Sequence, residues 1–222
     1  MKLVLALALA ALAICGFSQD EWQPLFDGES LEGWQVKSGF ATYKVEDGAI
    51  VGRTAKGSPN TFLCTQKTYD DFELEFEVKV DDALNSGVQI RSALKDAEKD
   101  GSYGGRVNGP QVEIEAGPGQ AGFIYGEATS RGWISDEPKS EDPEVNQHDH
   151  FKNGQWNKYR VVADGQSIKV WINGQLIEEL EDEDIYKTHP KGVIGLQVHG
   201  IGSDQDPCEV RWKNIRIRPL QK

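Results

Sequence analysis

Two carboxylates and an amide share one face of a short segment near the middle of the chain, Gln111-Val-Glu-Ile-Glu115. Side chains alternate between the two faces of a strand, so Gln111, Glu113 and Glu115 point to one side and Val112 and Ile114 to the other. Like charges at this spacing raise the pKa of one carboxyl group, which suits it to proton transfer near neutral pH. A polar stripe that only faces solvent gives the same pattern, so both interpretations stay open.

Aromatic residues near this segment favour a carbohydrate site. Tyr103, Tyr125 and Trp133 flank it in the sequence. Rings beside carboxylates provide the stacking and hydrogen bonding that sugars require. Arg91 precedes the segment and can supply a fixed cation in the same cleft. We therefore predict a polar cleft with aromatic walls in this part of the chain.

Three of the four histidines are further candidates for chemistry. His199 follows an apolar run and precedes Gly200, a position at the mouth of a sheet where an imidazole can carry protons. His148 and His150 place two imidazoles on one side of an acidic, extended segment. They are candidate metal ligands, although solvated loop residues produce the same spacing.

Short strands are the elements that must position these side chains. In Phe72–Val80, apolar residues alternate with charged ones, as they do in a half-buried strand. Asp47-Gly48, Asp164-Gly165 and Asn173-Gly174 each separate two such runs, which is typical of two-residue hairpins. Helices are expected to be minor, and the strands to form an antiparallel meander. Further strands are predicted at residues 43–45, 49–52, 88–91, 111–115, 159–163, 168–172, 193–198 and 210–217.

The number of strands indicates the architecture. One open antiparallel sheet of about ten strands would leave an apolar face in water. We therefore predict an all-β fold in which two antiparallel sheets pack face to face as a sandwich or jelly roll. Residues 19–222 are predicted to form one such domain, with residues 134–153 as a long loop over it.

Residues 1–18 are predicted to be a signal peptide. Lys2 precedes an apolar run that extends from residue 3 to residue 14, which is too short to span a membrane and has the length of a secretory leader. Cleavage is expected after Ser18. Lipoprotein anchoring at Cys15 is not expected, because the preceding Ile14 is not a small residue. The sequence thus predicts a secreted or periplasmic protein without stable membrane insertion.

The net charge of the chain limits the classes of molecule that it can bind. The chain has 36 acidic residues against 24 lysines and arginines, with a formal net charge of −12. No basic patch can outweigh that surplus, which argues against nucleic acid as a partner.

Two cysteines, Cys64 and Cys208, remain after removal of the leader. In an oxidising compartment such a pair suggests one disulfide. Two separate buried thiols are the alternative, because sequence alone does not place their Cα atoms within bonding range.

Several segments together resemble the 3-keto-disaccharide hydrolase domain family. The opening L-F-D-G-x-x-L-x-G-W pattern, the later N-S-G-x-x-x-R and the L-Q-x-H-G pattern are specific in combination, and the resemblance covers nearly the whole chain after the leader. It implies a concanavalin A-like jelly roll exported by bacteria that degrade glycans. The segments are residues 22–34, 85–91, 109–115, 125–126, 156–157, 171–174 and 195–200.

The resemblance also implies an activity, the cleavage of glycosides whose sugar already carries a ketone at C3. The ketone acidifies the C2 proton, whose removal lets the C1 substituent leave before water adds. In this scheme Glu113 or Glu115 is the acid or base, His199 the second proton carrier, and Arg91 or a divalent ion the enolate stabiliser. Many relatives have a motif nearer to E-x-Q-x-x-D where this chain has Q-V-E-I-E.

The implied substrate contacts and partners complete this hypothesis. No cofactor is certain, and a divalent metal ion stays open. A carbohydrate is the expected ligand, and a sugar 3-dehydrogenase that makes the ketone is the expected functional partner. The residues expected to hold the sugar are Asn85, Tyr103, Gln111, Tyr125, Trp133 and Gln197.

Two other classes of function remain open at this point. A carbohydrate-binding module without activity can use the same fold and the same amides, carboxylates and rings. A laminarinase-like glycosidase needs a nucleophile and a separate acid about 5 Å apart. Gln111 stands where the first carboxylate of such a motif belongs, so this reading ranks below keto-sugar chemistry.

Overall fold

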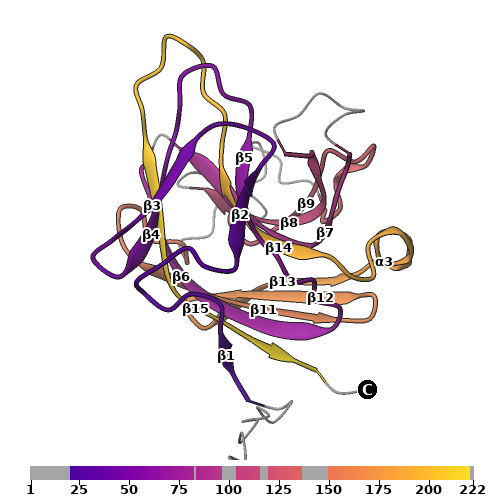
Figure 1. Cartoon of the computed structure of the whole chain (residues 1–222). Helices are drawn as coiled ribbons and strands as arrows, with labels where there is room; N and C mark the ends of the chain where they lie inside the picture. Colours follow the sequence, from indigo (N-terminus) through magenta and orange to yellow (C-terminus); the bar gives the residue numbers. More distant parts are fainter. Residues whose placement is uncertain (1–20, 83, 97–103, 116–119, 137–149, 221–222) are drawn as a thin grey trace, which may run out of the picture.

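The computed structural model describes residues 21–82, 84–96, 104–115, 120–136 and 150–220. Two antiparallel sheets, A and B, are packed face to face (Figure 1). Sheet A is built from β1 (Gln23–Pro24), β3 (Thr42–Glu46), β4 (Ala49–Arg53), β6 (Phe72–Val80), β11 (Asn157–Asp164), β12 (Ser167–Ile172), β13 (Gln175–Glu181) and β15 (Glu209–Pro219). Sheet B is built from β2 (Trp34–Lys37), β5 (Thr61–Thr65), β7 (Asn85–Leu94), β8 (Val107–Glu115), β9 (Ile124–Glu127), β10 (Gly132–Trp133) and β14 (Val193–Val198).

The strand order confirms the predicted sandwich and limits the predicted meander to parts of it. Sheet A runs β13-β12-β11-β6-β15-β4-β3, with β1 beside β15, and sheet B runs β10-β9-β8-β7-β14-β5-β2. Consecutive strands are neighbours from β7 to β10 and from β11 to β13. The pairs β6–β15 and β7–β14 instead join segments far apart in sequence, and they hold the centre of each sheet.

The alternation in β6 sets the boundary between core and surface. Phe72, Leu74 and Phe76 are buried between the sheets, and the Phe76 ring stacks on Tyr159 of β11 at 5.0 Å. Full burial of such a side chain contributes about 1.5–3 kcal/mol. The intervening Glu73 lies on the outer face and pairs with arginines of β11 and β15. Period two in the sequence is therefore realised as an apolar inner face and a charged outer face.

Tight turns and one short helix complete the frame. Asp47-Gly48 and Asn173-Gly174 have positive φ at both residues, as type I′ hairpin turns require. They connect β3 to β4 and β12 to β13, as predicted. Within the described residues the one helix is α3 (Glu183–Thr188), whose N-cap Asp182 accepts a hydrogen bond from Ile185 N.

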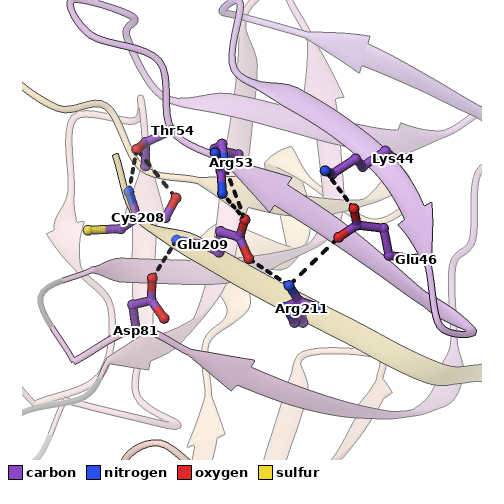
Figure 2. Close-up of polar contacts among 8 residues, drawn as sticks. All are labelled: Lys44, Glu46, Arg53, Thr54, Asp81, Cys208, Glu209 and Arg211. Carbon is purple, nitrogen blue, oxygen red and sulfur yellow. Dashed lines mark hydrogen bonds and ion pairs between the residues drawn. The ribbon is translucent and has the colours of Figure 1, made fainter. Parts of the chain in front are cut away.

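Ion pairs cover the outer face of sheet A where β3, β4 and β15 lie side by side (Figure 2). Glu209 pairs with Arg53 at 2.5 Å and with Arg211 at 2.7 Å. Glu46 pairs with Lys44 at 2.6 Å and lies 3.7 Å from Arg211. In each pair at least one side chain is about a third or more exposed to solvent, so each pair contributes at most about 1 kcal/mol. The network makes this face polar.

Of the two alternatives left open for Cys64 and Cys208, the structure supports two separate thiols, because both cysteines are free. Cys64 lies on β5, the strand next to the β2 edge of sheet B, and packs with Phe62, Val107 and Val193. Cys208 directly precedes β15 of sheet A, where its N–H donates to the Thr54 hydroxyl (Figure 2).

The leader prediction, residues 1–18, concerns a segment outside the described residues and stays a prediction. Across the described ranges, no helix has the length and apolar character needed to cross a membrane.

Candidate functional site

A small pocket lies on the outer face of sheet B, where β9, β8, β7 and β14 are adjacent. Its volume is about 240 Å³. Because outward positions on these strands are aligned by the sheet register, residues far apart in sequence meet there. The lining residues are Asn60, Asn85, Gln111, Glu113, Gln120, Tyr125, Glu127, Trp133, Gln197 and His199.

Glu113 of β8 is the most perturbed group of the pocket. It is 4% exposed, and burial raises its pKa to about 8, although hydrogen bonds from Gln111 and Asn85 act in the opposite direction. Gln111 Nε2 donates to Oε1 at 2.6 Å and Asn85 Nδ2 donates to Oε2 at 3.2 Å. The group is therefore a carboxylic acid at neutral pH that both neighbouring amides hold in place.

A line of polar side chains continues from Glu113 beneath the pocket. Gln89 Nε2 donates to Gln111 Oε1 at 2.6 Å, and Ser92 Oγ donates to Gln89 Oε1 at 2.5 Å. Gln89 and Gln111 are opposite one another in the β7–β8 register. The sequence pattern identified Gln111 but gave no sign of the two residues behind it.

His199 follows β14 and presents a defined tautomer to the pocket. Its Nδ1 lies 2.8 Å from the Gly200 carbonyl oxygen. A carbonyl only accepts, so Nδ1 carries a hydrogen and the neutral ring has its lone pair on Nε2. The loop is fixed because Gly200 N donates to Asn60 Oδ1 at 2.9 Å. His199 thus offers an accessible base.

Two acceptor atoms at the site lack a hydrogen-bond partner among the described residues, Gln197 Oε1 and Glu115 Oε2. The Gln197 residue is 1% exposed. A buried acceptor left unpaired costs about 1–3 kcal/mol. A ligand hydroxyl that donates to such an atom would remove this cost, which is what a sugar offers.

Glu115 and Glu127 add negative charge near His199. Burial raises the pKa of both carboxyl groups, and the nearby imidazole opposes the rise. Glu115 does not line the pocket itself, in contrast to the prediction that all three polar residues of Gln111–Glu115 would face it directly.

The aromatic prediction is met by Tyr125 and Trp133. They are paired across β9 and β10, and their rings meet edge to face with centroids 5.4 Å apart. Both line the pocket. Tyr103, the third ring of the prediction, lies outside the described residues.

The structure places Arg91 outside the cleft, which corrects the prediction made for it. It does not line the pocket, and its guanidinium pairs with Asp71 at 2.7 Å and donates to the Gly165 carbonyl in the turn between β11 and β12. Arg91 has φ of +49° at a point where the β7 register shifts. Such a bulge interrupts the alternation of side chains along the strand, and the Arg91 side chain contacts residues beside sheet A instead of the pocket. Arg91 therefore joins the sheets and is not the enolate stabiliser.

The proposed histidine pair for a metal receives no support. His148 lies outside the described residues. His150 borders a different cleft beside β13 together with Leu176 and Glu179. In the part of the chain that the structure describes, no three His, Cys, Asp or Glu side chains are grouped as metal ligands.

Three pocket residues escaped the sequence analysis, namely Asn60, Gln120 and Glu127. Glu127 follows Tyr125 by two positions on the same strand, so alternation would have placed both on one face. Asn60 and Gln120 lie in loops, and no periodic signal marks them.

The model of the 3-keto-alpha-glucoside-1,2-lyase-like domain family matches residues 21–218. No curated protein matches the sequence.

Solved structures share the fold at low sequence identity. A Parabacteroides distasonis protein with the provisional name of glycosyl hydrolase is 20% identical, with a TM-score of 0.59 over 90% of this chain and 94% of that one. The carbohydrate-binding module CBM66 of Bacillus subtilis is 13% identical, with a TM-score of 0.55 over 84% and 95%. The laminarinase catalytic domain of Thermotoga petrophila is 12% identical, with a TM-score of 0.54 over 91% and 100%. Enzymes and binding modules both occur among these neighbours. The fold therefore does not distinguish the two functions, and the distinction must come from the residues of the site.

Proposed function

The chain belongs to the 3-keto-alpha-glucoside-1,2-lyase-like domain family, and on that premise we propose that it cleaves glycosides of 3-keto sugars by elimination followed by hydration. Family membership and fold make it a carbohydrate-active protein. The keto sugar, the chemical steps and the residue roles are the proposal.

The main support for this proposed activity is that a neutral carboxylic acid and an imidazole with a free Nε2 line the same small pocket. Burial keeps Glu113 protonated with a pKa of about 8, and the Gly200 carbonyl leaves the lone pair of His199 on Nε2. Elimination needs one group that accepts a proton and one that donates a proton. The pocket contains both before any substrate binds.

In the proposed reaction, Glu113 and His199 carry out all the proton transfers. His199 Nε2 removes the proton from C2, which the C3 ketone acidifies. The electron pair forms the C1–C2 double bond as the C1–O bond breaks, and Glu113 gives its proton to the departing oxygen. Water then adds across the double bond, with its hydroxyl at C1 and a proton from His199 returning to C2, while Glu113 recovers a proton from water.

Polar groups around this pair suit the rest of the sugar. Gln197 Oε1 has no partner in the described structure and can accept from a sugar hydroxyl. The edge-to-face pair of Tyr125 and Trp133 offers an aromatic wall. Since Arg91 is committed to Asp71, charge on the enolate oxygen is left to neutral donors such as the amide of Asn85.

Export to the periplasm or the medium, and a sugar 3-dehydrogenase that supplies the ketone, complete the proposal. An oxidised sugar is required as substrate, so a reaction that makes it must come first.

A carbohydrate-binding module is the second candidate. The CBM66 neighbour and the aromatic wall support it. A pure receptor does not need a buried acid held neutral beside a free base, which is why catalysis ranks first.

The test is an assay of a 3-keto-glucoside and its unoxidised parent, with and without a chelator. We expect aglycone release from the keto compound alone, lost in Glu113→Gln and His199→Ala. Glu77→Gln, on the outer face of sheet A, is the matched carboxylate control. Saturable sugar binding without turnover of either compound would replace the enzyme with a binding module.

A further inference from the structure

Four side chains form a continuous hydrogen-bonded line under the candidate site. Ser92 Oγ donates to Gln89 at 2.5 Å, Gln89 donates to Gln111 at 2.6 Å, and Gln111 donates to Glu113 at 2.6 Å. All four residues are at least nine-tenths buried. Neither Ser92 nor Gln89 lines the pocket.

The polarity of this line follows from the Ser92 contact. Each amide has an accepting end and a donating end, so the orientation of Gln89 sets that of Gln111. The 2.5 Å contact between Ser92 Oγ and Gln89 Oε1 falls in the usual range for an O–H···O hydrogen bond. The reverse orientation would leave the Ser92 hydroxyl only its longer contacts, 3.2 Å to the Ile90 carbonyl and 3.4 Å to the Pro110 carbonyl. Ser92 therefore favours the orientation in which every donor points toward Glu113.

This polarity determines where the acid proton of Glu113 goes. Gln111 and Asn85 both donate to the carboxyl group, so neither amide accepts its proton. The proton is left to point into the pocket. If Gln111 were reversed, its carbonyl would accept that proton and withhold it from a substrate.

We propose that Ser92 and Gln89 are positioning residues that act through Gln111 to keep the proton of Glu113 available to the substrate. The inference rests on the proposed function, in which Glu113 is the proton donor. It adds a role for two residues that no substrate touches.

Other groups that face Glu113 stay in place when the line is altered. They are Glu115 on the same strand, Glu127 on β9 and His199 after β14. From sheet A, the Tyr159 hydroxyl donates to the Glu113 backbone carbonyl at 3.3 Å. Their charges are common to the parent and the variants, so a change in titration reports on the line itself.

The variants Ser92→Ala and Gln89→Met remove the hydroxyl and the first amide, respectively. Ser38→Ala is the matched control, because Ser38 is also a buried serine near sheet B but bonds to Gly105 and Val107. Carboxyl carbons are labelled with 13C, and the Glu113 signal is identified by its loss in Glu113→Gln. The measurements are the Glu113 titration, the melting temperature, and kcat and KM for a 3-keto-glucoside.

In Ser92→Ala and Gln89→Met we expect the Glu113 midpoint to rise, by on the order of one pH unit, because a hydrogen bond to the ionised form is lost. We expect kcat to fall several-fold while KM changes less than about twofold. Ser38→Ala should show neither change. Gln89→Met tests the same line if Ser92→Ala does not fold.

A folded Ser92→Ala or Gln89→Met with the parent's Glu113 midpoint and kcat overturns the proposal. A shifted midpoint in a protein that never cleaves the keto sugar supports the positioning of Glu113 and removes the proposed function. The titration therefore separates the two failures.

Discussion

Gln111 lies directly against Gly87 on the neighbouring strand: a Cβ atom on Gly87 would come 2.5 Å from the Gln111 carboxamide carbon. Gly87 is opposite Glu113 in the β7–β8 register. The absence of a side chain at Gly87 therefore gives Gln111 the space from which it reaches Glu113.

Gly87→Ala should displace Gln111 and weaken its hydrogen bond to Glu113. Overpacking of this kind costs about 1–3 kcal/mol, and turnover of the keto sugar should fall at least about tenfold. Urea unfolding and initial rates measure both. Gly202→Ala is the control, because the nearest atom there is the end of the Asp204 side chain. Unchanged rates in Gly87→Ala would show that Gln111 does not position the acid.

Stability should fall as pH rises between about 4.5 and about 8, because burial raises the pKa of Glu113 from 4.5 to about 8. In this window the folded state keeps a proton that the unfolded state has lost, so folding is favoured at the low end. At about 1.4 kcal/mol per unit, the full effect is on the order of 5 kcal/mol. Glu115 and Glu127, whose pKa values are also raised, add in the same direction. Melting temperatures of the parent and Glu113→Gln across this range give the comparison, and equal slopes would contradict the assignment.

Arg91→Met should destabilise the protein without a specific effect on chemistry. It removes the ion-pair partner of Asp71, which is 3% exposed, and breaking a buried pair in this way costs about 3–5 kcal/mol. The matched variant Arg53→Met breaks an exposed pair with Glu209 (Figure 2) and should cost less than about 1 kcal/mol. Urea unfolding compares the two. If Arg91→Met kept the stability of the parent protein and lost turnover, Arg91 would have a role in the reaction.

Gln197→Met should raise the stability of the protein and lower its affinity for sugar. The substitution removes an acceptor that is buried without a described partner, so stability should rise by about 1 kcal/mol. Sugar affinity should fall, because the hydroxyl that donates to Oε1 loses its acceptor. Calorimetric titration and thermal melting give the two readouts, and Gln175→Met on the sheet edge is the control. A variant that binds sugar as the parent does would exclude Gln197 from recognition.

Two free thiols should be found in protein that lacks residues 1–18. Cys208 is partly exposed and should react with iodoacetamide in the folded state. Cys64 should react only after unfolding, since burial raises its pKa to about 12. Mass spectrometry counts the labels. Recovery of an unlabelled, disulfide-linked species would overturn the free-thiol assignment.

The sequence by itself predicted the class of fold and much of the pocket. Alternation in Phe72–Val80 identified the core face, and the Asp-Gly and Asn-Gly turns identified the hairpins, because both signals are local. The same rule placed Gln111 and Glu113 on one face. The position of His199 after an apolar run and before Gly200 made it a candidate, and the family resemblance added Asn85 and Gln197. Edge strands such as β2 and β10 were missed because they are short and only weakly periodic.

Features that depend on contacts between distant segments could be assigned only from the tertiary structure. The Arg91 side chain, which was expected in the cleft, instead pairs with Asp71, which directly precedes β6 of sheet A. Cys64 and Cys208 could be assigned as free thiols only when each was placed in the fold. The raised pKa of Glu113 and the line from Ser92 arise from burial and from the β7–β8 register, which no single segment encodes. Local patterns fix which face a side chain takes, whereas its partners and its protonation depend on strands that meet only in the folded protein.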